Sequence, residues 1–314
     1  MDFGILPEIL FWGLYAGSIY ILLAIGLNLI FGVMKVVNFA HGELLMLSIY
    51  ITFLLHSVLG LNPYLIVPIT MVLMFFIGVL IERVCFRPIM GTGKLNEIFM
   101  SLALIYLIQN GVALVWGNDY NTIHSPLGNS KLVIAFDNSL IVDVIDIQST
   151  SLKQYNASWM MSLSLDHVVI ISVTVFLLLM FYLFMWKTKT GKAMRATSQN
   201  REAAMLAGIN VERMDMISFG LGASFAAAAS LWWITGLQFN PYVGSIPAIK
   251  AFAVIIFGGL GSIQGAIAGG LIYGIAENAS SYVFGGAWKD ATSFIILVLM
   301  LVLRPTGLFG EGED

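Results

Sequence analysis

The chain has 314 residues, of which 59% are hydrophobic and only 11% are charged, and its mean hydropathy is +0.89. These proportions exclude an ordinary soluble domain. The formal net charge of −3 carries little information, because in a membrane protein the placement of charge matters more than its total. The single cysteine, Cys85, has no partner for an internal disulfide or a metal site, so we expect an ordinary small apolar residue near a helix end.

Apolar runs recur along the chain at close to the ~20 residues that a helix needs to cross ~30 Å of hydrocarbon. Lipid offers no hydrogen bonds, so each run must satisfy its own backbone, which makes it a helix. Strands of a membrane barrel would alternate apolar and polar residues, and the run 9–34 does not. Asp2 and Glu8 precede this run without any basic residue, and it is about twice as long as the apolar part of a signal peptide. We therefore expect an all-α polytopic membrane protein with an uncleaved first span.

Nine segments are expected to form the spans. In chain order they are 9–34, 36–59, 64–81, 98–116, 167–186, 214–235, 240–257, 263–284 and 291–303. The second opens with the polar residues Asn38, His41 and Glu43, and the seventh contains Pro241 and Pro247. We therefore expect two broken helices among about eight to ten transmembrane helices.

The connection 117–165 is the only extended polar region of the chain. Residues 132–136 and 140–147 flank Asp137-Asn138, which predicts a small β-hairpin. A connection of this length is unusual, so we expect a functional role for it.

The orientation follows from the basic residues, which favour the cytoplasmic side. They place the loop 83–94, the segment 187–213 and Arg304 inside, and therefore the N-terminus and the connection 117–165 outside. Re-entrant loops are the alternative for the segments 36–59 and 240–257. If the segment 36–59 were re-entrant, however, Arg87 and Lys94 would lie outside. If the segment 240–257 were re-entrant, the C-terminus would lie outside. Nine crossings are therefore expected.

The order of the spans predicts an inverted repeat within a single transmembrane domain that covers residues 1–314. Spans 1–4 (residues 9–116) start outside and spans 6–9 (residues 214–304) start inside, while the linking span 167–186 joins them. In each half the second span is the interrupted one. Halves of opposite direction with matching interruptions are typical of transporters whose substrate path lies at the broken helices.

The segment 187–213 carries six basic residues and two acidic ones. Within it, Asn200 suits an N-cap, Glu202 suits the positive end of a first helical turn, and Gly208 suits the left-handed position after a helix. Three alanines between these caps give a smooth face beside Met205. Topology alone explains Lys187, Lys189 and Lys192, but it does not explain a capped helix with a small-residue face. This helix therefore indicates a docking element.

No phosphate-binding loop with its lysine, no metal-ligand cluster and no nucleophile motif is visible, so the sequence indicates neither nucleotide hydrolysis nor other catalysis. The run Gly258-Gly259-Leu260-Gly261 lacks the lysine and the strand–helix setting of a phosphate loop. We expect it to form a tight turn between two closely packed helices.

Polar residues inside a membrane are costly, so each is a candidate for a translocation path. The candidates are Asn28, Asn38, His41, Glu43, Gln264, Glu277 and Asn278. The alternative is that they form interhelical hydrogen bonds that fix the bundle, or, for His41 and Glu43, that they lie at the cytoplasmic interface. Glu277 lies 13 residues after Gln264, about 20 Å along a helix, so one small ligand could not touch both. Lys250 is expected to extend to the outer surface.

Four stretches resemble the branched-chain amino acid ABC transporter permease family. They are GLNLIFGVMKVVNFAHGELLMLSIY (26–50), GKAMRATSQNREAAMLAGIN (191–210), NPYVGSIPAIKAF (240–252) and GGLGSIQGAIAGGLIYGIAEN (258–278). The run RPTGLFG at 304–310 continues the match. The resemblance covers nearly the whole chain outside 117–165, and it is closest to the first of that system's two paralogous permeases.

The resemblance implies a heterodimer with a second permease in the inner membrane, two cytoplasmic ATPase subunits and an extracytoplasmic binding protein, with membrane lipid but no nucleic acid as a further partner and no cofactor. It also implies that 195–210 contains the helix that couples to an ATPase. The residues expected there are Arg195, Asn200, Glu202, Ala203, Ala204, Leu206, Gly208 and Asn210. The expected substrates are leucine, isoleucine and valine, although paralogues carry other amino acids, short amides or urea.

Two other classes of function stay open. A self-sufficient secondary transporter would use His41, Glu43 or Glu277 as a proton relay and would need no ATPase. A structural or receptor-like membrane scaffold would carry no flux at all.

Overall fold

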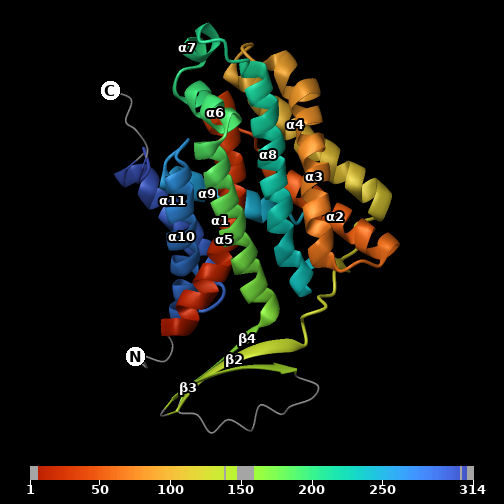
Figure 1. The fold of residues 1–314 in the computed structure, drawn as a ribbon, viewed down its shortest axis with the longest axis vertical. Helices are drawn as coiled ribbons and strands as arrows, with labels where there is room; N and C mark the ends of the chain where they lie inside the picture. The colour runs from red at the N-terminus through yellow and green to blue at the C-terminus, as the bar shows by residue number, and fades with distance from the viewer. Residues whose placement is uncertain (1–5, 138, 147–158, 305, 310–314) are drawn as a thin grey trace.

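The computed structural model describes residues 6–137, 139–146, 159–304 and 306–309. Its helices are α1 (Leu6–Met34), α2 (His41–Leu59), α3 (Pro63–Ile81), α4 (Lys94–Trp116), α5 (Leu165–Lys187), α6 (Lys189–Gln199), α7 (Arg201–Leu206), α8 (Val211–Ala229), α9 (Ser245–Gly258), α10 (Ile263–Phe284) and α11 (Trp288–Leu303). Its strands are β1 (Asn121–Thr122), β2 (Ser130–Asp137), β3 (Ser139–Asp146), β4 (Trp159–Ser164) and β5 (Gln238–Phe239). Figure 1 shows the short helix α7 at one end of the helical bundle and the sheet of β2, β3 and β4 at the other.

Six of these helices are long and apolar enough to cross a membrane on their own: α1, α2, α3, α4, α5 and α8. The pair α9 and α10 is bent by 118° at a short break and counts as one further broken span or as a re-entrant segment. α11 has only 16 residues. The chain is therefore an all-α polytopic membrane protein, as expected. Among the described residues a helix lies in each of the nine expected segments, but only six spans, or seven if α9 and α10 form one, are candidates to cross the membrane, so nine crossings stay a prediction.

The irregular backbone lies only partly where the sequence pattern placed it: residues 36–40 and 240–244 are non-helical, as the polar start of the second segment and Pro241 indicated. The segment 36–59 contains an uninterrupted helix from His41 to Leu59, and the irregular backbone precedes it, between Met34 and His41. Pro247 likewise does not interrupt α9, because it is the third residue of that helix. The first four N–H groups of a helix have no acceptor within it, so a proline there removes no hydrogen bond. The break of the second half follows α9, at residues 259–262.

α1 forms the centre of the bundle, and nearly all of its residues from Tyr15 to Met34 are buried. It packs against α10 through facing glycines: a Cβ atom added to Gly274 would lie 2.5 Å from both the carbonyl oxygen of Gly13 and the amide nitrogen of Gly17. Small residues of this kind let two helix backbones approach closely, which is how membrane helices gain packing without a hydrophobic driving force.

The expected β-hairpin is confirmed. β2 and β3 pair antiparallel from Ser130 opposite Asp146 to Asp137 opposite Ser139, and β4 adds to the other edge of β2. A second, two-stranded ribbon joins β1 to β5, which leads toward α9. At the base of the sheet, the Asp166 carboxylate accepts hydrogen bonds from the hydroxyl groups of Tyr64, Ser125 and Ser164. These contacts tie the long connection to α3 and α5.

The crossing of α1 and α10 gives a test of the fold. Gly274→Val would force a side chain into the Gly13 and Gly17 backbone, so we expect it to destabilise the protein by about 1–3 kcal/mol or more. Gly111→Val on α4 is the matched control, because a Cβ atom there meets no atom within 4 Å. The measurement is the thermal unfolding midpoint in detergent. Equal midpoints for the two variants would contradict the observed packing.

Candidate functional site

α7 is a short helix with both ends capped. The Asn200 side chain accepts a hydrogen bond from the Ala203 amide at 2.9 Å. At the other end, the amides of Gly208 and Ile209 donate to the carbonyls of Met205 and Ala204, both at 3.0 Å. Gly208 has φ +80°, the left-handed conformation that this type of helix end requires. The predicted caps Asn200 and Gly208 are therefore confirmed.

The exposed surface of α7 is apolar. Leu206 is 91% exposed and Met205 is 53% exposed, and Ala203 is exposed beside them. Ala204 is only 4% exposed, so it belongs to the packed face of the helix and not to the open one. A helix that presents leucine and methionine to solvent, on a chain that can bury apolar groups elsewhere, has the surface of a docking element.

An ion pair between half-buried Arg201 and buried Asp215 ties α7 to the bundle, and the sequence analysis missed it. The Arg201 guanidinium donates to both carboxylate oxygens of Asp215 on α8, at 2.9 and 2.5 Å, and to the Val33 carbonyl at the end of α1, at 3.2 Å. Two-pronged arginine–carboxylate pairs fix orientation as well as distance. The available signal was Asp215 itself, an acid within an apolar span, which needs a cationic partner.

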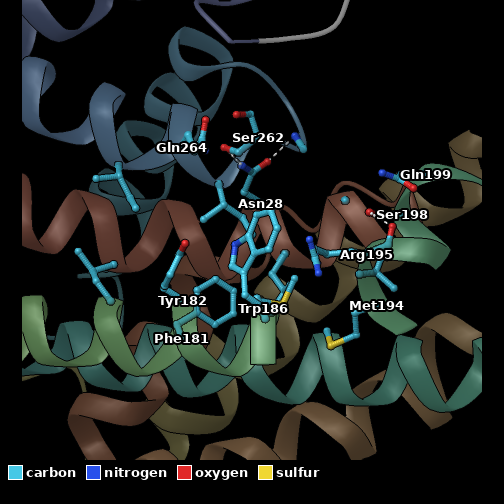
Figure 2. A pocket seen from close by; sticks show the side chains of 18 residues that line it. Asn28, Phe181, Tyr182, Trp186, Met194, Arg195, Ser198, Gln199, Ser262 and Gln264 are labelled. Atoms are coloured by element: carbon cyan, nitrogen blue, oxygen red, sulfur yellow. Dashed lines mark hydrogen bonds between the residues drawn. The ribbon is translucent and has the colours of Figure 1, made fainter. Parts of the chain in front are cut away.

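The other predicted residues of this segment have different surroundings. Glu202 is exposed in the first turn of α7, and Asn210 caps α8 by accepting from the Arg213 amide at 2.9 Å. Arg195 on α6 points into a cavity of about 310 Å³ and not to the open surface (Figure 2). Its guanidinium carbon lies 3.9 Å from the centre of the Trp186 ring.

Asn28, predicted for the path, holds the break between α9 and α10. Its amide nitrogen donates to the Ser262 carbonyl at 2.6 Å, and its amide oxygen accepts from the Gly261 amide at 2.5 Å, as the dashed lines in Figure 2 show. From the other side, the amides of Leu308 and Phe309 donate to the carbonyls of Phe257 and Gly258 at 2.9 and 3.0 Å. The break is therefore satisfied by α1 and by the segment after α11.

Asn38, His41 and Glu43 lie at the start of α2. The side-chain oxygen of Asn38 accepts from the Ala40 amide at 3.0 Å, which stabilises the turn into the helix. Glu43 accepts from the Gln109 amide of α4 at 2.9 Å, and its second oxygen is buried without a partner among the described residues. Among the described residues, both ring nitrogens of His41 are buried without a well-formed hydrogen bond. The backbone of Leu23 lies close enough to interact weakly with the imidazole ring. Neither side chain lies at an exposed interface.

Glu277 belongs to a buried charged group on α1, α9, α10 and α11. It accepts from the Tyr20 hydroxyl at 2.5 Å and pairs with Lys250, whose ammonium also lies 2.8 Å from a carboxylate oxygen of Asp290. Lys250 is 8% exposed, so the expectation that it extends to the outer surface is wrong. Lys250 is buried because it pairs with Glu277: two opposite charges that pair inside the bundle avoid the cost of an isolated charge.

The last two predicted path residues, Gln264 and Asn278, lie on α10. Gln264 is exposed near the start of the helix and lines the cavity of Arg195. Asn278 donates to the carbonyls of Gly274 and Trp12. Among the described residues, no hydrogen bond joins the groups around Asn28, Glu43 and Glu277 to one another. No three His, Cys, Asp or Glu side chains in that part of the chain are placed to hold a metal ion.

These features define a class: a polytopic membrane protein with paired charges between its helices, polar groups in its interior and a short helix with an exposed apolar surface at one end. The family model of the branched-chain amino acid transport system permease component matches residues 9–303. The chain therefore belongs to this family.

Three curated relatives are similar over nearly their whole length. The high-affinity branched-chain amino acid transport system permease protein BraD of Pseudomonas aeruginosa is 32% identical over 96% of this chain and 94% of its own. LivH of Escherichia coli, which has the same description, is 32% identical over 97% and 95%. The probable branched-chain amino acid transport permease protein LivH of Methanocaldococcus jannaschii is 29% identical over 93% and 89%. A comparison with solved structures finds no significant match.

The group around Glu277 gives a test of whether its charges hold the bundle together. Lys250→Met leaves Glu277 buried without a cation, which we expect to cost about 3–5 kcal/mol. Glu277→Gln should cost less, because Lys250 keeps Asp290 at 2.8 Å. The double variant Lys250→Met/Glu277→Leu should regain much of the loss, since well-packed apolar pairs can replace a buried ion pair. Thermal unfolding of the three variants measures this order, and additive losses in the double variant would contradict the pairing.

Proposed function

We propose that this chain is a membrane-embedded permease subunit of an ATP-binding cassette importer for branched-chain or chemically similar amino acids. The observation that carries the proposal is α7, a capped helix with an exposed apolar surface and a charged tie to the bundle. Similarity over 95% of the length of LivH supports the same assignment. A membrane protein that worked alone would have no evident use for such a helix.

In the proposed assembly, this chain and a second, paralogous permease lie in the inner membrane. Two ATPase subunits bind on the cytoplasmic side, and a binding protein acts on the outer side. In this arrangement the α7 end of the bundle faces the cytoplasm and the β2–β4 sheet faces outside. The concentration of six basic residues in 187–213 supports this orientation, because basic loops stay on the cytoplasmic side. The N-terminus then lies outside and the C-terminus inside. The inverted repeat of spans 1–4 and 6–9 belongs to the same proposal.

In the proposed mechanism, closure of the ATPase dimer moves α7. Arg201 passes the movement to two helices at once, since it bonds both Asp215 on α8 and the Val33 carbonyl at the end of α1. α1 in turn holds the α9–α10 break through Asn28. A movement of α7 therefore reaches the irregular segments on either side of α9, where alternating access would open the path to one side and then to the other.

The residues proposed for coupling have two different roles, according to whether their side chains are exposed or cap a helix. Ala203, Leu206 and Met205 form the proposed contact surface, because they are exposed together. Asn200, Gly208 and Asn210 shape the segment through their caps and turns.

The translocation path is proposed to pass the seven intramembrane polar residues named from the sequence. Among them, Gln264 is exposed and therefore the most available to a passing molecule. Glu43 and His41 are buried, but both have polar atoms without a partner among the described residues. Asn28, Asn38, Glu277 and Asn278 already make hydrogen bonds that shape the helices.

A secondary, proton-coupled transporter is the second candidate function. The observation that favours it is the buried pair of groups at the start of α2, His41 and Glu43, which have unused hydrogen-bonding atoms in the described part of the chain. Such groups can exchange protons along a pathway. An importer of urea or short amides is a further alternative, because a paralogous permease could combine with another binding protein.

A flux measurement separates these functions. The full transporter, reconstituted in liposomes with its ATPases and its binding protein, should take up radiolabelled leucine only when ATP is on the ATPase side. Excess isoleucine or valine should compete, and urea or acetamide should not. Uptake driven by a proton gradient in liposomes that contain the permeases alone would overturn the proposal in favour of the secondary transporter.

Two variants of the α7 segment test the coupling. Leu206→Asp places a charge in the proposed apolar contact, so we expect ATPase association to weaken roughly tenfold or more. Arg201→Gln leaves that surface intact but removes the charged tie to Asp215, so it should retain association and lose transport. Affinity capture of the ATPases and leucine uptake measure the two effects.

Val144→Asp is the matched control, since Val144 is 57% exposed on β3, at the opposite end of the bundle. It should leave ATPase association unchanged. Normal association and transport in Leu206→Asp would remove α7 from the coupling proposal.

A further inference from the structure

The cavity of Arg195 lies between α1, α5, α6 and the start of α10. Its volume of about 310 Å³ corresponds to about ten water molecules, enough for part of an extended ligand. Figure 2 shows Arg195, Ser198 and Gln199 gathered at one side of the cavity, which we call its polar end. Asn28, Ser262 and Gln264 line another side, and residues of α5 form an apolar wall. Asn28 and Gln264 are candidates for the translocation path, but Arg195 and the α5 wall have no role in that path.

The polar end carries an unpaired cation. The guanidinium of Arg195 stacks on the Trp186 ring at 3.9 Å, and its Nε atom is buried without a hydrogen-bond partner among the described residues. No carboxylate in that part of the chain forms an ion pair with Arg195, and the described residues that line the cavity include no Asp or Glu. The chain therefore leaves a positive charge facing a cavity without supplying the anion.

The start of α10 adds to the positive potential of the cavity. Ser262 caps the helix through the Gly265 amide at 3.0 Å, and its carbonyl accepts from Ala266. The two preceding amides, of Ile263 and Gln264, have no acceptor within the helix. Helix N-termini favour negatively charged groups, and these amides belong to residues that line the cavity.

The apolar wall comes from the last two turns of α5, between Leu178 and Trp186, roughly 12 Å of helix length. α5 lies on the surface of the bundle, and most of its side chains are not buried. Trp186 and Lys187 end this helix, the arrangement that marks the headgroup level of a bilayer. The polar end of the cavity is therefore at headgroup depth, and the apolar wall is at acyl-chain depth.

We propose that this cavity binds an anionic phospholipid of the adjacent leaflet. Its phosphate bonds Arg195 and the start of α10, and an acyl chain lies along Phe181 and Leu178 of α5. The lining favours this occupant over an amino acid, because no carboxylate is present to receive an ammonium group. It favours a lipid over soluble phosphate, because phosphate would leave the apolar wall uncovered. Basic pockets between membrane helices are suited to such headgroups.

The site lies between two elements that the proposed mechanism couples. One wall belongs to α6, which leads directly into α7, and another belongs to the α9–α10 break at Gly261 and Ser262. A lipid that bridges these walls holds the two elements together. The lipid proposal assumes that the chain lies in a membrane, but it does not depend on which substrate is transported.

The test compares lipid retention by the full-length chain in nanodiscs of phosphatidylcholine with one-fifth phosphatidylglycerol, measured by native mass spectrometry. Arg195→Gln should reduce bound phosphatidylglycerol by about fivefold or more. Lys192→Gln is the matched control: it removes one positive charge from the same helix, but Lys192 is exposed and does not line the cavity. It should retain the lipid as the original chain does.

Gly32→Ile is a second variant that fills the cavity without a change of charge. A Cβ atom on Gly32 meets nothing closer than 3.9 Å, so the added side chain enters free space. It should also release the lipid, and size-exclusion profiles check that all variants fold. Equal losses in Arg195→Gln and Lys192→Gln would show only diffuse attraction. Unchanged retention in Arg195→Gln, or displacement of the lipid by 10 mM inorganic phosphate, would overturn the proposal.

Discussion

The break between α9 and α10 is the constraint on which the structure depends. A helix that stops inside a bundle leaves peptide groups that lipid cannot satisfy, and each unsatisfied group costs several kcal/mol. The protein solves this with two remote segments: Asn28 bonds both Gly261 and Ser262, and residues 308–309 bond the last carbonyls of α9. The central helix, the end of the chain and the bent pair are therefore held at one point.

The buried acids follow a related rule, with two departures. Glu82, Asp215 and Glu277 each face a cation. Among the described residues, Asp166 accepts only from hydroxyl groups and Glu43 only from the neutral amide of Gln109. Paired acids hold helices together and are expensive to disturb. An acid whose partner is neutral is freer to exchange that partner, which explains why Glu43 is a better candidate for contact with a moving molecule than Glu277.

Much of the architecture could be predicted from the sequence, because it depends on local rules. Asn200 and Gly208 act within one turn of backbone, and the hairpin of β2 and β3 follows from two short apolar strands around a turn. The places where prediction failed depend on partners that are distant in sequence. Lys250 is buried because Glu277 lies beside it, and Ala204 is packed because of where α7 sits on the bundle. The helix break at 259–262 was visible as glycines, but its stabilisation by Asn28 could not be read without the fold.

The burial of α1 has a consequence for biosynthesis. This helix is made long before α10, so the glycine surface that it presents to α10 has no partner until a segment beginning at Ile263 has been synthesised. At ~5–20 residues per second, that interval lasts roughly 10 to 45 s. During it, a helix destined for the interior must remain beside the insertion machinery or in lipid. Quality control therefore has a long interval in which to detect an unfinished chain, and a ribosome that stalls before α10 leaves α1 mostly apolar but unassembled.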